Sequence, residues 1–466
     1  MKDLPLNKTV LKIAAPAVLE LVLTSLSQLV DTVMVGGIGA YAIAGIGITN
    51  QPRFVMLASF IALNVGTTAL MARFRGANDK ASADIVTAQS VFLTAALAAV
   101  ITVPGWLFAR PMMRALGSSG EALEAATEYF RITSLAFVPT ALPLVISALL
   151  RGVGDTKIAL RFNVTANAVN LAFDWLLIYG NLGFPALGVR GAAIATVLGN
   201  LSACVMAFAA ISGRGRRAAS GAGGNAGLRA RLKRSSDFVE LRLVPSLIAP
   251  NPSMLARIVR IGLPSAGEQL ALRVGLVLYT VTISALGTRA FAAHQIALSL
   301  LNMSFVIGQA YGIAAASLAG QALGRKDPAL ARRAAAAARR QGTVIATTVG
   351  VLLYLFRYPL ISLFTRESDI VTMAAEVLIV VALLQPFQSS FQVLSGALRG
   401  AGDSLYPALS LAFGILVVRP VLSLAFVHGL GWGLTGAWYA LLTDQTMRFL
   451  MLWLRFRTGK WTNARV

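Results

Sequence analysis

Acidic and amide side chains recur at helical spacing inside two strongly apolar segments of this chain. The segment 13–35 contributes Glu20, Thr24, Ser27, Gln28 and Asp31. The segment 159–180 contributes Asn163, Asn167, Asn170 and Asp174. At roughly 100° per residue, each set forms one polar stripe along a helix. Because a charged group in a lipid environment is costly, these stripes indicate a functional site or a wet path.

Two of the acids predict a cation site. Asp31 and Asp174 lie a few residues from corresponding ends of their segments, so a rise of about 1.5 Å per residue puts them at similar depth. Thr196 enters from the same side on the segment 190–212. Together with Asn170, one turn below Asp174, these side chains could hold a proton or a desolvated Na⁺. The alternative is that they only hydrogen-bond neighbouring helices together.

Further polar residues are predicted to line a substrate path. They are Glu20, Gln28, Asn163 and Asn167, with Glu268 and Tyr279 in the second half of the chain. Pro16 and Pro264 are predicted hinges, because a missing amide hydrogen bond lets a helix bend. Pro16 lies on the same segment as Asp31, so cation binding could bias the bend.

The composition places these stripes in a membrane protein. Of 466 residues, 56% are hydrophobic and 13% are charged, whereas soluble domains carry about 25% charged residues. About twelve apolar runs are long enough to cross a hydrocarbon core of about 30 Å. We therefore predict an all-α integral membrane fold. Its predicted spans lie near residues 13–35, 50–72, 86–109, 130–150, 159–180, 190–212, 255–286, 293–320, 340–364, 372–398, 406–428 and 433–456.

The second half of the chain repeats the first at an offset of 248 residues. Pro16 corresponds to Pro264, Glu20 to Glu268, and the loop 151–155 to the loop 399–403, both with the pattern Arg-Gly-x-Gly-Asp. Six spans per half is an even number, so the halves are parallel repeats, as in many transporters. The predicted organisation is a six-helix lobe at 1–212, a basic cytoplasmic linker at 213–253 and a second six-helix lobe at 254–460.

The two halves differ in their polar residues. At the repeat positions of Asp31, Asn170 and Asp174, the second half has Tyr279, Val418 and Leu422. Cation coupling is therefore predicted in the first half alone.

Charged residues inside the spans of the second half are expected to form buried ion pairs that hold that lobe together. They are Glu268, Arg273, Arg419 and Asp444. Alternatively, Glu268 contacts a cationic substrate. In each Arg-Gly-x-Gly-Asp loop, the arginine and the aspartate are expected to pair locally.

The formal net charge of +22 is unevenly distributed. Arg and Lys crowd into alternate loops, which predicts a multi-pass protein of the plasma membrane (the inner membrane in a bacterium) with both termini in the cytoplasm. The basic segments lack interleaved aromatic residues, so nucleic-acid binding is disfavoured. The single cysteine, Cys204, excludes a disulfide within the chain. The pattern Gly431–Gly436 lies between two spans, not between a strand and a helix, so we reject a dinucleotide site and predict no cofactor.

Several motifs resemble the multidrug and toxic-compound extrusion (MATE) family. They are Asp31-Thr-Val-Met-Val-Gly36, Asn170-x-x-x-Asp174, Gly191-Ala-Ala-x-Ala-Thr196, Ala293-His-Gln-Ile296 and Gly320-Gln-x-Leu-Gly324. The resemblance covers nearly the whole chain. It implies two six-helix lobes around a V-shaped cleft and efflux of organic cations or drugs in exchange for H⁺ or Na⁺. It also implies that Asp31, Asn170 and Asp174 bind the coupling cation, and that Pro16 bends the first helix.

The leading interpretation is a monomeric secondary antiporter that exports cationic, amphipathic small molecules across a lipid membrane. The runner-up is a lipid or polysaccharide flippase of the related superfamily, but intramembrane basic residues such as Arg53, Arg273 and Arg419 are few. An enzyme is disfavoured, because the sequence has no zinc-protease or nucleophile-elbow motif. The sequence does not decide whether the coupling ion is H⁺ or Na⁺, since both would use the same carboxylates.

Overall fold

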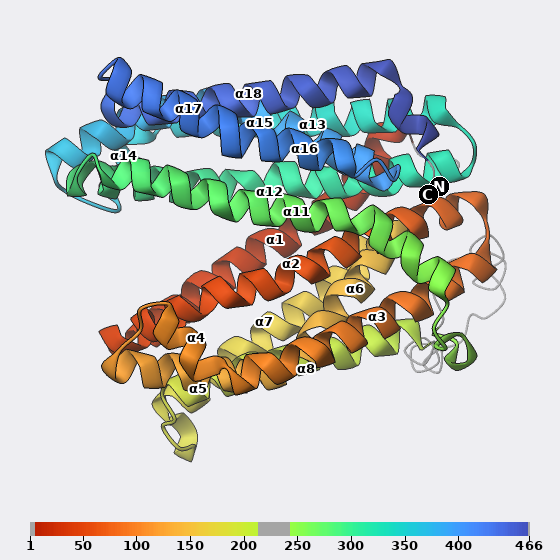
Figure 1. Cartoon of the computed structure of the whole chain (residues 1–466), viewed down its shortest axis with the longest axis horizontal. Coiled ribbons are helices and arrows are strands. Elements are labelled where there is room, and N and C mark those ends of the chain that lie inside the picture. The colour runs from red at the N-terminus through yellow and green to blue at the C-terminus, as the bar shows by residue number, and fades with distance from the viewer. Residues whose placement is uncertain (1–4, 213–242, 465–466) are drawn as a thin grey trace, which may run out of the picture. The chain divides into compact units, whose positions relative to one another are not determined.

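The computed structural model describes residues 5–212 and 243–464, and within these ranges it contains helices and no strand (Figure 1). The predicted linker 213–253 therefore lies largely outside the described residues. Each predicted span coincides with a helix or with consecutive helical segments, so the all-α prediction is confirmed.

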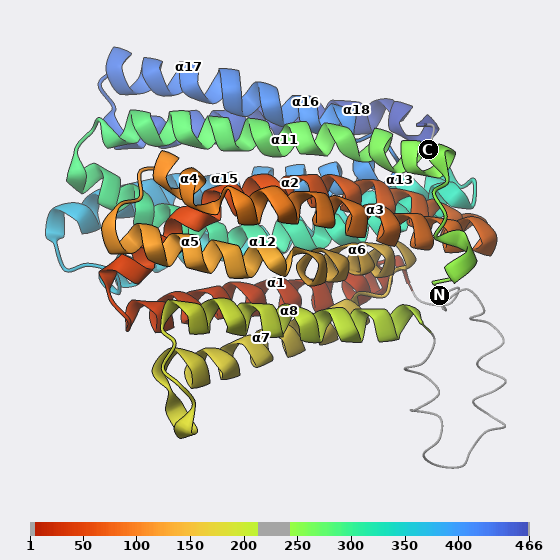
Figure 2. The same ribbon diagram turned by 60° about the horizontal axis from the view of Figure 1, so that its bottom comes forward.

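The first repeat consists of long helices joined by short turns. They are α1 (Leu6–Gly36), α2 (Ala40–Ala77), α3 (Lys80–Leu107), the short α4 (Ala109–Ala115), α5 (Gly120–Leu135), α6 (Phe137–Val153), α7 (Thr156–Tyr179) and α8 (Val189–Ile211). Helices α5 and α6 bend by 56° at their junction and together correspond to one predicted span. The turn between α7 and α8 contains the 3-10 segment Asn181–Gly183 and protrudes beyond the ends of both helices (Figure 2).

The second repeat follows the same order. Its helices are α11 (Pro252–Ser284), α12 (Thr288–Gly324), α13 (Pro328–Leu355), the short α14 (Arg357–Ser362), α15 (Ser368–Gly400), α16 (Leu405–Phe413), α17 (Arg419–Leu424) and α18 (Gly433–Thr458). Two π-helical segments, Gly414–Val418 and Ala425–Gly429, flank α17 and continue it into one long span. Short 3-10 turns lie at Pro245–Leu247 and Lys460–Asn463.

Seven of the described helices are each long and apolar enough to cross a membrane, and eight are if the bent pair of α5 and α6 counts as one span. The long helices that fall short of this test are α7, α11, α13 and α18. Each carries several polar or charged residues within its length. Their low hydropathy thus reflects polar faces, which must be buried among other helices or face water.

The chain divides into two compact units whose boundaries fall inside helices. One unit comprises Met1–Val18 and Ile261–Val466, and the other comprises Leu19–Arg260. Helices α1 and α11 therefore each contribute to both units. Pro16 lies inside α1 and Pro264 inside α11, each within four residues of a boundary. A proline frees a backbone carbonyl from the helical ladder, so both positions suit a bend.

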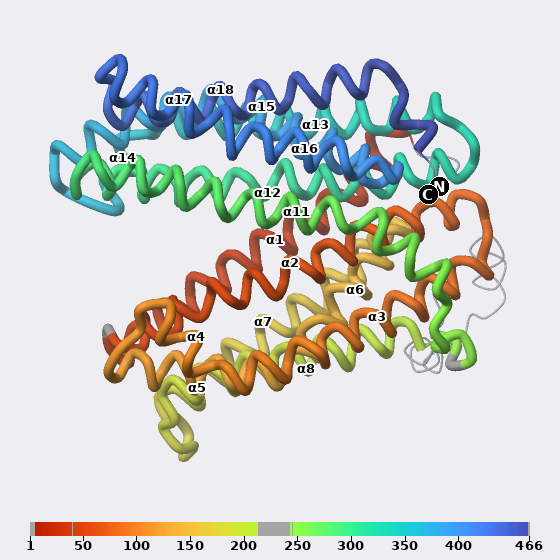
Figure 3. The backbone as a smooth tube through the Cα atoms, in the orientation of Figure 1, coloured from red at the N-terminus to blue at the C-terminus, as the bar shows by residue number. Residues whose placement is uncertain are grey.

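Small residues let the helices of the second repeat pack closely. Helices α12 and α15 lie side by side, as the backbone trace shows (Figure 3). A Cβ added to Gly396 of α15 would lie 2.7 Å from the Cα of Gly312 of α12. Gly400 approaches the backbone of Ala316 in the same way, one turn further along. Since dispersion and hydrogen bonding hold helices together within lipid, such close contact between backbones is the main source of packing energy here.

We expect Gly396→Val to lower the melting temperature of the purified protein, because the larger side chain forces α12 and α15 apart at a cost of about 1–3 kcal/mol or more. Gly267→Ala in α11 is the matched control, since an added Cβ there meets no atom within 4 Å. The control is expected to unfold at or slightly above the native temperature. Equal melting temperatures for the native protein and Gly396→Val would contradict this packing.

Candidate functional site

Two acids from neighbouring helices meet in the first repeat. The side chains of Asp31 in α1 and Asp174 in α7 lie close enough to interact directly. The Asn170 Nδ2 atom donates a hydrogen bond of 2.9 Å to Asp174 Oδ2. Asp174 is 2% exposed, and Asp31 Oδ1 is buried without a hydrogen-bond partner. Two adjacent carboxylates repel each other, so this arrangement favours a proton or a cation between them.

This pair differs from the other buried acids among the described residues. Glu20, Glu268, Asp403 and Asp444 each accept a hydrogen bond from an arginine. Asp174 accepts one from an amide and lies beside a second acid. Arg53 of α2 interacts electrostatically with Asp31, but no hydrogen bond joins the two. In the part of the chain that the structure describes, Asp174 is therefore the buried acid that accepts no hydrogen bond from a guanidinium group, and its acidic neighbour Asp31 is half-buried.

The donor set suits a proton or a small hard cation. The carboxyl oxygens of Asp31 and Asp174 and the Oδ1 atom of Asn170 are oxygen ligands of the kind that alkali and alkaline-earth cations prefer. Within the described residues, no group of three or more His, Cys, Asp or Glu side chains is placed to hold a metal ion.

Thr196 is not hydrogen-bonded to the acids. Its hydroxyl donates to the Ala192 carbonyl of its own helix, α8, at 2.9 Å. Its role in the cation site stays a prediction. The α8 residue that contacts the site is instead Gly199, where an added Cβ would lie 3.0 Å from the Cβ of Asn170. The sequence signalled this position only by a glycine in an apolar helix.

The inner part of the α1 stripe forms a separate ion pair. Arg151 Nη2 donates to Glu20 Oε1 at 2.6 Å, and Asn163 Nδ2 donates to the same oxygen at 2.8 Å. Glu20 is buried, and its second oxygen has no hydrogen-bond partner. The structure thus joins Glu20 and Asn163, two residues predicted to line the substrate path, in one ion-pair network.

The same pair recurs in the second repeat. Arg399 Nη2 donates to Glu268 Oε1 at 2.5 Å, and the glutamate is again buried. The carboxylate is therefore already paired in this structure, and contact with a substrate would have to compete with Arg399.

The expectation of local pairing within the Arg-Gly-x-Gly-Asp loops is wrong. Each arginine donates a hydrogen bond to a glutamate on another helix. The aspartates of the two loops have other hydrogen-bond partners. Asp155 Oδ1 accepts a hydrogen bond from the Ile158 amide and caps α7. Asp403 Oδ2 accepts one from Arg455 Nε at 2.9 Å. Since an intramembrane carboxylate gains more from a guanidinium than a solvated loop aspartate does, the long-range pair is the more favourable one.

A second charged cluster lies in the interior of the second repeat. Asp444 Oδ2 accepts from Arg419 Nη2 at 2.7 Å and from Arg419 Nε at 2.9 Å, and it also accepts from Arg448. Arg419 and Asp444 thus form one of the buried ion pairs expected among the charged residues of this repeat, and Arg448, which the sequence analysis does not name, joins them. The guanidinium of Arg419 also lies over the ring of Tyr279, 5.3 Å from its centroid, and Tyr279 donates its hydroxyl proton to the Ala437 carbonyl.

Local backbone irregularity makes room for this cluster. Arg419 follows directly after the π-helical segment Gly414–Val418. A Cβ on Gly414 would lie 2.8 Å from Arg448 Cγ and would also press on Asp444. Single π turns are often found at functional sites, because the extra residue re-aims neighbouring side chains. Periodicity alone gives no signal for such a turn.

The other predicted path residues are not brought together. Gln28 is exposed on α1, and Asn167 of α7 has a buried Nδ2 atom without a hydrogen-bond partner. Their contribution to a substrate path stays a prediction.

We expect Glu268→Gln to lower the free energy of unfolding by about 3 kcal/mol, because it leaves the Arg399 charge without its partner. Replacing both residues, as Glu268→Gln with Arg399→Gln, should cost less than the sum of the single changes. Glu124→Gln is the control, since Glu124 forms an exposed pair with Arg110 and its loss should cost less than about 1 kcal/mol. Additive effects in a double-mutant cycle would contradict a coupled buried pair.

Comparison with known proteins covers nearly the whole chain. The MatE family profile matches residues 16–176 and 264–424, two stretches related by the same 248-residue offset. A probable multidrug resistance protein NorM of Thermotoga maritima is 28% identical over 473 residues, covering 99% of this chain and 94% of that protein. An uncharacterized transporter, YisQ of Bacillus subtilis, is 25% identical and covers 92% of this chain and 90% of its own.

Solved transporter structures share the fold. A multidrug resistance MATE family transporter of the MOP superfamily, in an outward-facing conformation, has a TM-score of 0.86 at 24% identity and covers 98% of this chain and 97% of its own. Structures of MATE in straight and bent conformations each have a TM-score of 0.85 at 24% identity and cover 99% of this chain. They cover 98% and 97% of their own chains, respectively. This likeness shows the two-lobe helical fold. With the family profile matched over both repeats, the chain belongs to the multidrug and toxic-compound extrusion (MATE) family of multi-pass membrane transporters.

Proposed function

We propose that this chain is a secondary antiporter that exports amphipathic organic cations and other drugs in exchange for H⁺ or Na⁺. The observation that carries the proposal is the close pair formed by half-buried Asp31 and buried Asp174, which has no guanidinium hydrogen-bond partner among the described residues. The multidrug resistance relatives support the substrate class. The basic loops support a plasma-membrane location with both termini in the cytoplasm.

Binding and release of the coupling cation would take place at the pair of Asp31 and Asp174. With a proton or Na⁺ bound, the negative charges of Asp31 and Asp174 are partly neutralised and the two helices can stay close. When the cation leaves, two carboxylates remain close together in a poorly solvated place and repel each other. The free energy of that repulsion is available to drive α1 and α7 apart. Alternating access then follows from a difference in cation occupancy between two arrangements of the helices.

Helix α1 is the element that would transmit this change. Asp31 lies in its outer part, and Pro16 lies close to the point where α1 passes from one compact unit to the other. A bend at Pro16 would redirect the rest of α1 and carry Asp31 with it. Straight and bent conformations described for similar transporters support a hinge of this kind.

One cation site per chain is expected. Tyr279 stands at the repeat position of Asp31, and the guanidinium of Arg419 lies over its ring. The second repeat thus places a fixed positive charge beside the counterpart of the coupling acid. A second free cation there would be repelled, so we assign coupling to the first repeat alone.

The decisive experiment measures gradient-driven efflux of a fluorescent cationic drug from vesicles that contain the native protein or Asp31→Asn. We expect the variant to lose at least tenfold in rate under the gradient that drives the native protein, because an amide cannot exchange the cation. Imposing pH and Na⁺ gradients separately decides between the two ions. Asp369→Asn is the matched control, since Asp369 forms an exposed pair with Arg289. Unchanged efflux in Asp31→Asn would refute the assigned role.

Pro16→Ala tests the hinge. We expect the variant to keep cation binding, because it leaves Asp31, Asn170 and Asp174 untouched, but to transport several-fold more slowly, because the restored hydrogen bond favours a straight α1. Binding of the coupling ion and efflux are measured on the same preparation. Native transport rates in Pro16→Ala would remove the hinge from the mechanism without affecting the cation site.

A further inference from the structure

We propose that the beginning of α13 binds the headgroup of an anionic phospholipid, whose acyl chain lies along the exposed face of the same helix. The proposal goes beyond transport and takes from the proposed function only its orientation, in which the start of α13 is on the cytoplasmic side. The binding site is a hollow between the first residues of α1 and α13, both of which belong to one compact unit.

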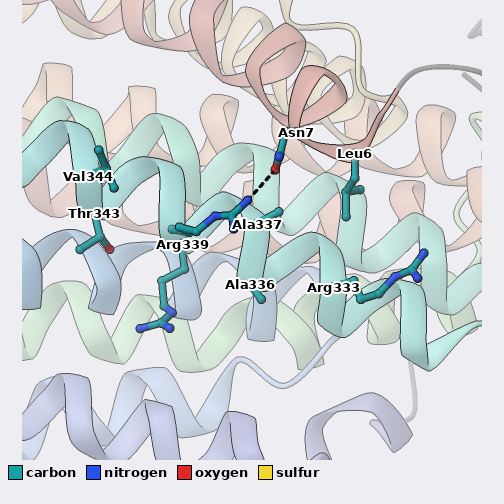
Figure 4. Close-up of a pocket in the computed structure, with 9 residues that line it drawn as sticks. Leu6, Asn7, Arg333, Ala336, Ala337, Arg339, Thr343 and Val344 are labelled. Carbon is teal, nitrogen blue, oxygen red and sulfur yellow. Dashed lines mark hydrogen bonds between the residues drawn. The ribbon is translucent and has the colours of Figure 1, made fainter.

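The hollow is large enough for a headgroup. Its volume is about 660 Å³, within the range of about 300–1,000 Å³ that is typical of small-molecule sites. Leu6 and Asn7 of α1 face the turns of α13 that carry the basic residues (Figure 4). Three of the lining residues are the arginines Arg333, Arg339 and Arg340.

Among the described residues, no acid compensates the positive charge of the hollow. No carboxylate lines it, and none of its three arginines forms an ion pair among the described residues. Arg340 Nη2 donates a long hydrogen bond of 3.4 Å to Asn7 Oδ1, which is neutral. Asp327, the acid that precedes these arginines at the start of α13, caps the helix by accepting a hydrogen bond from the Leu330 amide. Planar guanidinium groups bind phosphate oxygens in pairs, so phosphate is the ligand group that this cluster recognises best.

The same face of α13 changes from basic to apolar along its length. Arg333, Arg340, Val344, Val351 and Leu355 are spaced by 7, 4, 7 and 4 residues and are all exposed. At about 100° per residue they fall within roughly 60° of one another around the helix. The face therefore presents guanidinium groups at one end and branched aliphatic side chains after them.

The dimensions of this face fit one leaflet. From Val344 to Leu355 the helix rises about 16 Å at about 1.5 Å per residue, close to half of a hydrocarbon core of about 30 Å. The two arginines precede this apolar stretch and so lie at headgroup level. Basic pockets beside helix ends on the cytoplasmic side are a known mode of binding for acidic lipids. The apolar continuation favours a phospholipid over a free phosphate ion.

The test measures lipid binding to the purified full-length protein by native mass spectrometry, with phosphatidylglycerol and phosphatidylcholine as probes. We expect phosphatidylglycerol to bind more tightly. The double variant Arg333→Gln, Arg340→Gln should bind it about 25-fold more weakly, since each basic residue near a membrane surface contributes about 1 kcal/mol. Lys157→Gln with Arg161→Gln is the matched control, because both residues are exposed and one helical turn apart on α7, and it should leave the affinity unchanged.

Two further arms separate the sources of binding. Val351→Ser is expected to weaken binding of long-chain phosphatidylglycerol, because it removes apolar surface that the acyl chain would contact. The variant does not change the arginines that would bind the headgroup. Glycerol phosphate, which has no acyl chain, should compete poorly. Equal affinity for the two lipids, an equal loss in the control, or full competition by glycerol phosphate would overturn the proposal. Because binding is measured without a gradient, failure of Asp31→Asn to affect efflux would leave this result untouched.

Discussion

The structure depends on how charge is neutralised where water is scarce. Burial of an unpaired carboxylate costs several kcal/mol, so buried acids survive only with a compensating partner. Glu20, Glu268 and Asp444 meet this requirement with arginines that are part of the chain. Asp174 does not, since its neighbours are Asn170 and Asp31. In the proposed mechanism, its compensation comes from a proton or a cation that can leave, which would distinguish this site from the structural ion pairs.

Because the chain is duplicated, the glutamate–arginine ion pairs and the acidic pair can be compared between its two repeats. The glutamate–arginine pair is kept in both repeats, with the same sequence separation of 131 residues between Glu20 and Arg151 and between Glu268 and Arg399. The acidic pair is kept in one repeat, because Tyr279 replaces Asp31 beside Arg419. The pairs present in both repeats therefore hold the common scaffold together, whereas the proposed cation site rests on positions at which the repeats differ.

Sequence reasoning predicted the helices, the repeat and the meeting of Asp31, Asn170 and Asp174, because hydropathy and helical phase fix which residues share a face and a depth. It failed where a partner lies far away in sequence. Arg151 was assigned to Asp155, four residues on, but it pairs with Glu20, which is 131 residues away. Likewise, nothing in the pattern around Gly414 indicates a π turn. Hydrophobic periodicity predicts which face of its own helix a side chain lies on. It does not predict which residue of another helix packs against that face.

Helix α1 contains Asn7, Pro16, Glu20 and Asp31 and so links the start of α13, the glutamate–arginine pair and the acidic pair. Near its start, the Asn7 side chain accepts a hydrogen bond from Arg340 of α13, and its middle is fixed through Glu20 to Arg151. Its outer part carries Asp31. Between the first two attachments lies Pro16, the point where the helical ladder is weakest. In the proposed mechanism, a change of charge at Asp31 would therefore act directly on a helix that can bend at Pro16, without a chain of intermediate side chains to carry the coupling. The second repeat has Pro264 and Glu268 but no counterpart of Asp31. Helix α11 can therefore bend at its proline, but it has no acid at which the coupling ion would bind. The proposed mechanism therefore assigns the start of ion-driven movement to α1.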